Sequence, residues 1–130
     1  ERLGSPDDKA NMAALLIRAA FPLLSPPPDY QQAADLAREV IRLSPANSPI
    51  LPTANYVLGL AVFQQMAAMD DEAVKTKSCP MAQQMKTMIE EAGPALQAGR
   101  SVNEAIVAPR IQAIDQFTAH INSLIKAYCK

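Results

Sequence analysis

The 130-residue chain is long enough for one domain with a single core and too short for two ordinary domains. Hydrophobic residues make up 49% of the chain and charged residues 19%, a balance that is typical of a folded protein and excludes a disordered segment. With 12 basic and 13 acidic residues the formal net charge is -1, so no cationic surface for nucleic acid is expected. No apolar run approaches the roughly 20 residues of a membrane-crossing helix, so no membrane-spanning segment is predicted.

The residue types favour helices along the whole chain. Only 4 residues are Gly and 5% are aromatic, and no segment alternates apolar and polar residues with the period of a strand. A first helix is predicted from about Pro6 to Leu24, because Pro6 suits the first helical position and apolar residues then recur at helical spacing. The prolines at positions 26–28 end this helix.

Two further helices are predicted in the middle of the chain. Asp29 is placed to cap a second helix that runs through Leu43. After a turn rich in proline, Pro52 opens a third helix that reaches about Met69. The stretch from Asp70 to Lys77 is acidic first and basic later, and it fits either a continuation of the third helix or a polar connector.

A fourth helix is predicted after Lys77. Ser78, followed two residues later by Pro80, is a start signal for a helix from about Pro80 to Ala98. The pair Gly93-Pro94 lies inside this helix and is a site where it can kink.

The last helix is predicted from Val102 to about Tyr128. Ser101 and Glu104 have the spacing of a capping box at its start. Pro109 is expected to bend this helix rather than end it, because the apolar pattern continues beyond it. That apolar stripe consists of Val107, Ile111, Ile114, Phe117, Ile121, Leu124, Ile125 and Tyr128.

Two consecutive segments resemble halves of tetratricopeptide (TPR) repeats, in a divergent form. The segment Asp29–Pro45 resembles the second helix of a repeat, with the aromatic residue Tyr30, the small residue Ala33 and a terminating Pro45 at the spacing of the family. The segment Ala54–Phe63 resembles the first helix of the following repeat. Its likeness rests on the pair Leu58-Gly59, followed by the small residue Ala61 before the apolar pair Val62-Phe63.

Gly59 belongs to that Leu-Gly pair. A glycine inside a helix costs about 1 kcal/mol relative to alanine, so close helix packing is the expected reason for it. We expect Gly59 to pack against the second helix near Ala33 and Ala37.

The resemblance implies an all-α fold for residues 1–130 as a single domain. Residues 6–98 would form two TPR-like hairpins of antiparallel helices, and residues 102–129 would form a long C-terminal helix that caps the exposed end of the stack.

The residues that could carry chemistry are scattered. His120 is the only histidine, and the two cysteines lie far apart, so no cluster has the spacing of metal ligands. The acidic pairs and runs fit helix ends and solvated faces rather than acid and base catalysts. We therefore expect no catalytic residue, no cofactor and no metal, and His120 is interpreted as a partly exposed helix residue.

The leading hypothesis for function is a non-catalytic module that binds a protein or peptide. TPR-like stacks bind partners on the face lined by the first helix of each repeat, which implies contacts by Asn11, Arg18, Asn55 and Gln64. The alternative is a structural or assembly domain that oligomerises, as a homodimer for example, through the apolar stripe of its C-terminal helix. A third interpretation, a small enzyme or ligand carrier, would require a closed apolar pocket.

Cys79 and Cys129 are predicted to form a disulfide. If the helices 80–98 and 102–128 are antiparallel neighbours, both cysteines lie toward the same end of the pair. The longer last helix overshoots by about 12 Å, which a bend at Pro109, an earlier helix start near Lys75 or a crossing angle would have to absorb. A disulfide implies an extracytoplasmic protein, periplasmic or secreted. The start at Glu1 fits an exported chain as well as a segment cut from a longer one, and the alternative is two unrelated thiols in a cytoplasmic protein.

Overall fold

The computed structural model describes residues 12, 15–24 and 29–129, and all of the regular structure in these residues is helical. Of the predicted first helix, residues 6–11, 13 and 14 lie outside them, whereas residues 12 and 15–20 are helical and continue into a short 3-10 helix, η1. In chain order the elements after residue 20 are η1 (Phe21–Leu24), α2 (Tyr30–Leu43), α3 (Leu51–Thr76), α4 (Cys79–Ala98), η2 (Arg100–Val102) and α5 (Glu104–Tyr128).

Two of the predicted helix starts are confirmed by their caps. The side chain of Asp29 accepts a hydrogen bond of 3.1 Å from the backbone N–H of Gln32, and it therefore satisfies one of the donors that the first turn of α2 leaves unpaired. The hydroxyl of Ser78 accepts a hydrogen bond of 3.2 Å from the N–H of Met81 in the same way. α4 then continues through Pro94 to Ala98.

The stretch from Asp70 to Lys77 prolongs α3. The helix includes Thr76 and ends where Lys77 takes a left-handed conformation, with φ of 52°. Ala73 is fully buried, so this polar stretch still presents one face to the core. Of the two interpretations that the sequence left open, continuation of the third helix is confirmed.

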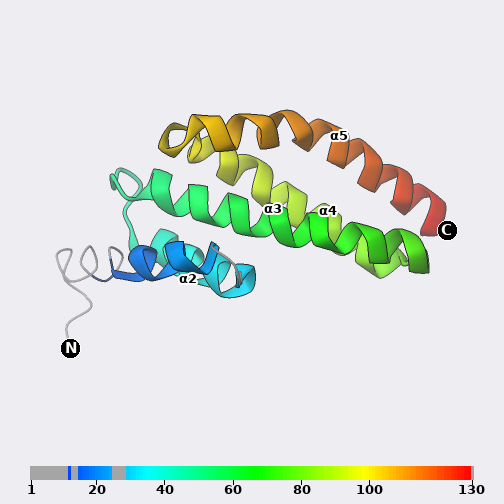
Figure 1. Cartoon of the computed structure of the whole chain (residues 1–130), viewed down its shortest axis with the longest axis horizontal. Helices are drawn as coiled ribbons and strands as arrows, with labels where there is room; N and C mark the ends of the chain where they lie inside the picture. Colours follow the sequence, from blue (N-terminus) through cyan, green and yellow to red (C-terminus); the bar gives the residue numbers. More distant parts are fainter. Residues whose placement is uncertain (1–11, 13–14, 25–28, 130) are drawn as a thin grey trace.

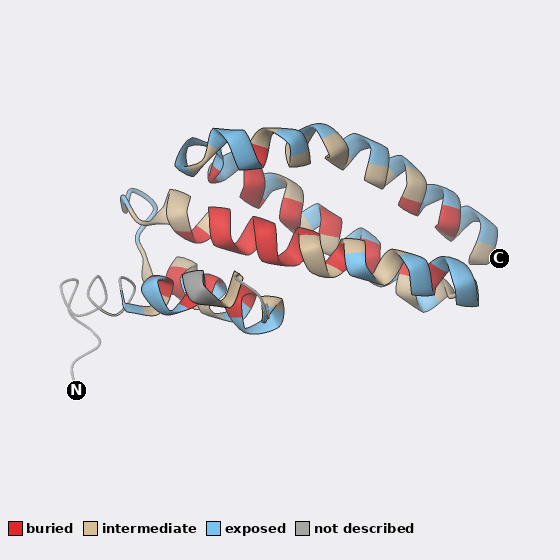
Figure 2. Cartoon of the chain, in the orientation of Figure 1, coloured by how far each residue is buried: buried red, intermediate tan, exposed pale blue. Residues whose placement is uncertain are grey.

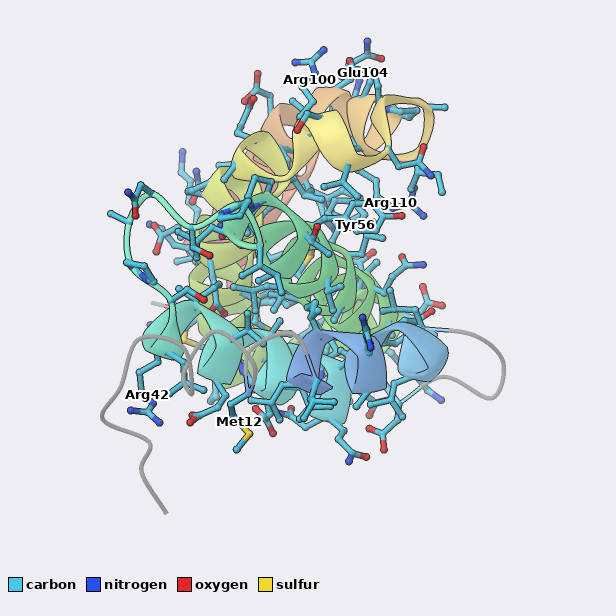
Figure 3. All side chains as sticks on the ribbon, turned by 90° about the vertical axis from the view of Figure 1, so that its left-hand side faces the viewer. Met12, Arg42, Tyr56, Arg100, Glu104 and Arg110 are labelled. Atoms are coloured by element: carbon cyan, nitrogen blue, oxygen red, sulfur yellow. A yellow bond between two sulfur atoms is a disulfide. The ribbon has the colours of Figure 1, made fainter. Side chains whose placement is uncertain are left out.

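The capping box predicted at the start of the last helix is wrong. Ser101 lies in η2, and α5 is capped two residues later by Asn103, whose side chain accepts a hydrogen bond from the N–H of Ile106. Glu104 instead pairs with Arg100 across the junction between η2 and α5, with 2.7 Å between Nε and Oε2 (Figure 3). Both Ser and Asn are favoured caps, and the extra 3-10 turn moves the helix start from one to the other.

The helices pack side by side, with α3 in the middle (Figure 1). α2 lies on one side of α3 and α4 on another, and α5 packs on α4 and makes a smaller contact with α3. α5 continues through Pro109 as one arched helix (Figure 1). The densest part of the core follows α3, where every residue from Tyr56 to Phe63 is buried (Figure 2).

Two glycines mark where α3 and α4 approach most closely. A Cβ atom at Gly59 would lie 2.8 Å from side-chain atoms and 2.9 Å from the backbone nitrogen of Leu96, so the expected packing against Ala33 and Ala37 of α2 is wrong and the close neighbour is α4. A Cβ at Gly99 would lie 2.4 Å from the nitrogen of Tyr56. The end of α4 therefore rests on the start of α3, as in an antiparallel pair.

Cys79 and Cys129 lie at disulfide distance, with 2.05 Å between their sulfur atoms. The first residue of α4 is thereby joined to the residue that follows α5. This confirms the predicted antiparallel arrangement of the last two helices, in which both cysteines lie at one end. The two cysteines of the chain are both used in this pair.

Candidate interaction surface

α3 and α5 meet through two side-chain contacts in the same order along both helices. The rings of Phe63 and Phe117 are 5.4 Å apart and nearly perpendicular, the edge-to-face geometry that aromatic pairs favour. One to two turns later, Nε2 of His120 lies 2.7 Å from Oδ1 of Asp70. Because the contacts 63–117 and 70–120 advance together, α3 and α5 run parallel to each other.

An open hollow of about 270 Å³ lies beside these contacts. It is lined by Asp70 from α3 and by Gln116, Phe117 and His120 from α5. Gln116 is exposed and the other three are partly exposed, so hydrogen-bonding groups surround part of an aromatic ring at the surface. Such a surface can bind both an apolar side chain and the polar groups of a peptide.

The Asp70–His120 contact fixes which hydrogen-bonding groups the hollow offers. A carboxylate oxygen accepts hydrogen bonds, so the tautomer of His120 that fits this contact is the one with its hydrogen on Nε2. In the neutral ring Nδ1 is then an acceptor. It has no partner among the described residues and can accept from a ligand.

Nothing in the sequence pattern indicates this pair. His120 is partly exposed, as expected, with 40% of its side chain accessible, but its contact with Asp70 was not predicted. The two residues are 50 positions apart on helices that are not consecutive, and helical periodicity predicts which face is buried without predicting the neighbour.

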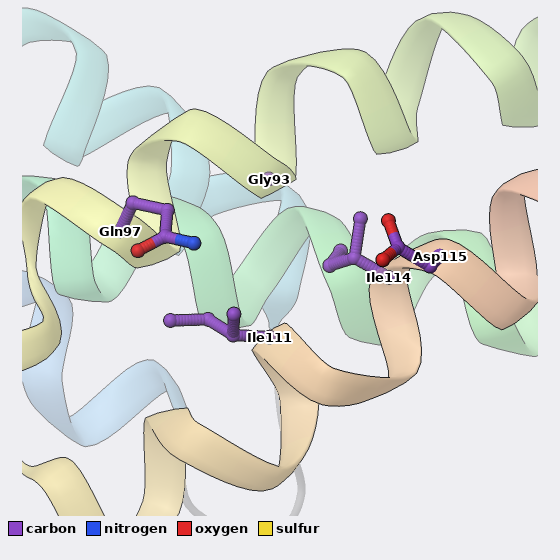
Figure 4. A pocket seen from close by; sticks show the side chains of 5 residues that line it. All are labelled: Gly93, Gln97, Ile111, Ile114 and Asp115. Carbon is purple, nitrogen blue, oxygen red and sulfur yellow. The ribbon is translucent and has the colours of Figure 1, made fainter.

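A second pocket, of about 170 Å³, lies between α4 and α5 (Figure 4). Gly93 and Gln97 contribute to it from α4, and Ile111, Ile114 and Asp115 from α5. The two isoleucines are half-buried, whereas Gln97 and Asp115 are exposed. This pocket therefore has an apolar floor and a polar rim, and it is on the opposite side of α5 from the hollow.

A charged contact joins the two helices that flank α3. Arg38 of α2 donates to both carboxylate oxygens of Glu91 in α4, at 2.9 Å from Nε and 2.8 Å from Nη2. Hydrogen bonding to Glu91 raises the pKa of Arg38 above its ordinary value, against the opposing effect of partial burial. Arg38 also bonds Asp35 within α2, so a small ionic network covers this side of α3.

Of the four residues predicted to bind a partner, the structure describes three, and their role in binding stays a prediction. Asn11 lies outside the described residues, and Arg18 is exposed on the helical segment 15–20. Asn55 and Gln64 are both half-buried on α3, but they are nine residues apart, which places them on opposite sides of a helix with 3.6 residues per turn. The amide of Asn55 also donates to the carbonyl of Leu51 at 3.0 Å and is partly engaged.

The apolar stripe of α5 is largely used within the chain. Val107, Ile121 and Leu124 are buried. The other members that pack against the core are half-buried: Ile111, Ile114, Phe117 and Ile125. Oligomerisation through this stripe stays a prediction, and it would have to use the edges of residues that already contact α3 or α4.

The described residues contain neither a metal-binding cluster nor a membrane-spanning helix. They hold no group of three or more His, Cys, Asp or Glu side chains placed to bind a metal ion. Within the same residues, no helix combines the length and the apolar character needed to cross a membrane.

No protein-family model, curated protein or solved structure matches the chain. The resemblance to TPR repeats therefore rests on the residues of segments 29–45 and 54–63 alone.

Proposed function

We propose that this domain is a non-catalytic interaction module that binds a peptide segment of a partner protein in the hollow between α3 and α5. The observation that carries the proposal is the hollow itself, where Gln116 and His120 surround the accessible part of Phe117. An apolar side chain of the peptide would pack on Phe117, and its polar groups would bond the amide of Gln116 and Nδ1 of His120.

The helix order supports a TPR-like interpretation of this surface. In a stack of helix hairpins the first helices of successive units lie parallel and line the binding face, and the parallel contacts of α3 with α5 fit that arrangement. On this interpretation α3 opens the second hairpin and α5 is the C-terminal capping helix. Gln64, one of the residues first expected to bind, is on α3 less than two turns before Asp70.

We further propose that the domain works in an extracytoplasmic compartment. The support is the pair of cysteines at disulfide distance, because disulfides persist in oxidising environments and are rare where thiols are kept reduced.

Selection from a displayed random-peptide library tests the peptide-binding proposal. The bait is the full chain isolated without reductant, and each selected peptide is then measured against two variants. Gln116→Lys changes the wall of the hollow, and we expect it to weaken binding at least about tenfold. Gln112→Lys adds the same charge at an exposed position of α5 outside both pockets and should leave the Kd unchanged.

Two results would overturn the proposal. One is a library that yields no peptide with saturable binding. The other is a set of peptides that bind the wild type and Gln116→Lys equally well, because the hollow would then not be their site.

A further inference from the structure

Gly93 lines the pocket between α4 and α5, where a side chain would project into the space beside Ile114. Unlike Gly59 and Gly99, Gly93 is not required by packing, since a Cβ placed there would have one near neighbour, Cγ2 of Ile114, at an ordinary 3.7 Å. It is not required by conformation either, since no glycine among the described residues has a positive φ. A glycine in a helix interior still lowers helix propensity, so packing of the isolated chain leaves Gly93 unexplained.

The rim of this pocket carries polar groups that nothing in the chain uses. The carboxylate of Asp115 forms no ion pair and no hydrogen bond with any described residue, and the same is true of the amide of Gln97. Gln97 lies beside the half-buried Ile111 and Asp115 beside the half-buried Ile114, at different ends of the pocket (Figure 4). The pocket thus combines an apolar floor with a negative charge at one end and an amide group at the other.

That combination selects a straight aliphatic chain that ends in a positive charge. The volume of about 170 Å³ is comparable to a cavity that holds a benzene-sized group. A methylene chain would lie on Ile111 and Ile114 over the backbone of Gly93, and an ammonium group, which only donates hydrogen bonds, would reach the carboxylate of Asp115. An anion would be repelled by Asp115.

We propose that this pocket binds an alkylammonium group, and that its natural occupant is a lysine side chain of the partner. The identity of the occupant rests on the proposed peptide-binding function, whereas binding of the alkylammonium group does not. The two pockets flank α5, so a partner that crosses this helix would place one side chain on Phe117 and a lysine beside Asp115.

The direct test is a titration of the 15N-labelled full chain with n-butylammonium chloride, followed by two-dimensional NMR. We expect saturable shifts at Gly93, Gln97 and Asp115 with a Kd of roughly 10 mM, because so small a ligand binds weakly. Sodium chloride at matched ionic strength and n-butanol, which has the chain without the charge, are the controls. Both should shift these signals less.

Three variants, one of them a control, locate the ligand. Asp115→Asn keeps the shape of the rim and removes its charge, and we expect the Kd to rise at least about fivefold. Asp71→Asn, at an exposed carboxylate of α3 that lines neither pocket, should leave the Kd unchanged. Gly93→Leu should abolish the shifts by filling the pocket, and circular dichroism would show whether that variant retains its helices.

The outcomes separate this proposal from the previous one. Absence of saturable shifts at these residues, or an equal Kd for Asp115→Asn and the wild type, would overturn the alkylammonium site even if library peptides bind. Saturable binding of n-butylammonium that depends on Asp115 would support the site even if no library peptide binds. If peptides are found, replacing their lysines by norleucine should weaken binding to the wild type and not to Asp115→Asn, and an equal loss for both would overturn the lysine assignment.

Discussion

Arg38 and Glu91, 53 positions apart in the chain, form a two-point hydrogen-bonded ion pair that links α2 to α4 on the surface of α3. Fork-shaped pairing of this kind is the strongest form of a surface ion pair. Both side chains are about two-fifths exposed, so solvent screens the pair and its contribution remains modest.

A double-mutant cycle measures that contribution. For Arg38→Ala, Glu91→Ala and the double variant we expect a coupling of about 0.5 to 1 kcal/mol in the free energy of unfolding, measured by urea denaturation, and a smaller value in high salt. Asp35 also bonds Arg38, so the cycle of Arg38 with Asp35 is the control and should give a smaller coupling. A coupling near zero for Arg38 and Glu91 would show that the pair does not hold α2 to α4.

Replacement of Gly59 in α3 and of Gly93 in α4 by alanine should change the stability of the fold in opposite directions. Gly59→Ala places a Cβ within 2.9 Å of the backbone nitrogen of Leu96, and we expect a destabilisation of about 1 to 3 kcal/mol because α3 and α4 must move apart. Gly93→Ala meets only an ordinary contact and should stabilise the fold by about 0.5 to 1 kcal/mol through helix propensity. Melting temperatures of the two variants, compared with the wild type, test this, and a lower value for Gly93→Ala would contradict it.

The sequence determined the positions of helices better than the partners of their side chains. Asp29 and Ser78 could be recognised as caps because a cap acts on the N–H groups of its own first turn, so the whole interaction is local. The extension of α3 through Ala73 was ambiguous, because its acidic and basic residues tolerate both a helix and a connector. Burial of Ala73 favours the helix over the connector, and that burial depends on the rest of the fold.

The candidate site was the least predictable part. Gly59 could be recognised as a point of close helix packing, but a small residue does not specify which neighbour approaches, and the neighbour is α4 rather than α2. The contact of Asp70 with His120 requires knowledge of how far α5 is displaced along α3. That displacement follows from the loop, the η2 turn and the packing of α4 together, none of which a periodic pattern contains.

The pH dependence of the free energy of unfolding should include a contribution from Glu39 of α2. Hydrogen bonding to Arg42 on the next turn lowers the pKa of Glu39 below its ordinary value of 4.5, and Coulombic attraction adds to the effect. Since the folded-state pKa is lower than the unfolded one, the pair stabilises the fold above the unfolded pKa, and this contribution is lost as pH falls through the lowered value.

An NMR titration of the Glu39 side-chain carboxyl group checks the shift. We expect a midpoint below 4.5 in the wild type and a return toward that value in Arg42→Gln, where the partner is removed. Glu90 is an exposed glutamate with no ion pair among the described residues and serves as the internal reference in both proteins. Identical midpoints of Glu39 in the two proteins would contradict the assigned cause.

Loss of the bond between Cys79 and Cys129 should destabilise the fold more than any surface change considered above. The bond spans 50 positions, and in the chain-entropy model closing a loop of that length contributes about 4 kcal/mol by restricting the unfolded chain. Cys79→Ala with Cys129→Ala, or reduction of the wild type, should therefore lower the free energy of unfolding by about 2 to 5 kcal/mol in urea denaturation. Reductant should have no effect on the double variant, which is the matched control. Intact-mass measurement after alkylation of the unreduced, natively isolated protein completes the test, because two alkylated cysteines would rule out the bond and remove the support for the proposed extracytoplasmic location.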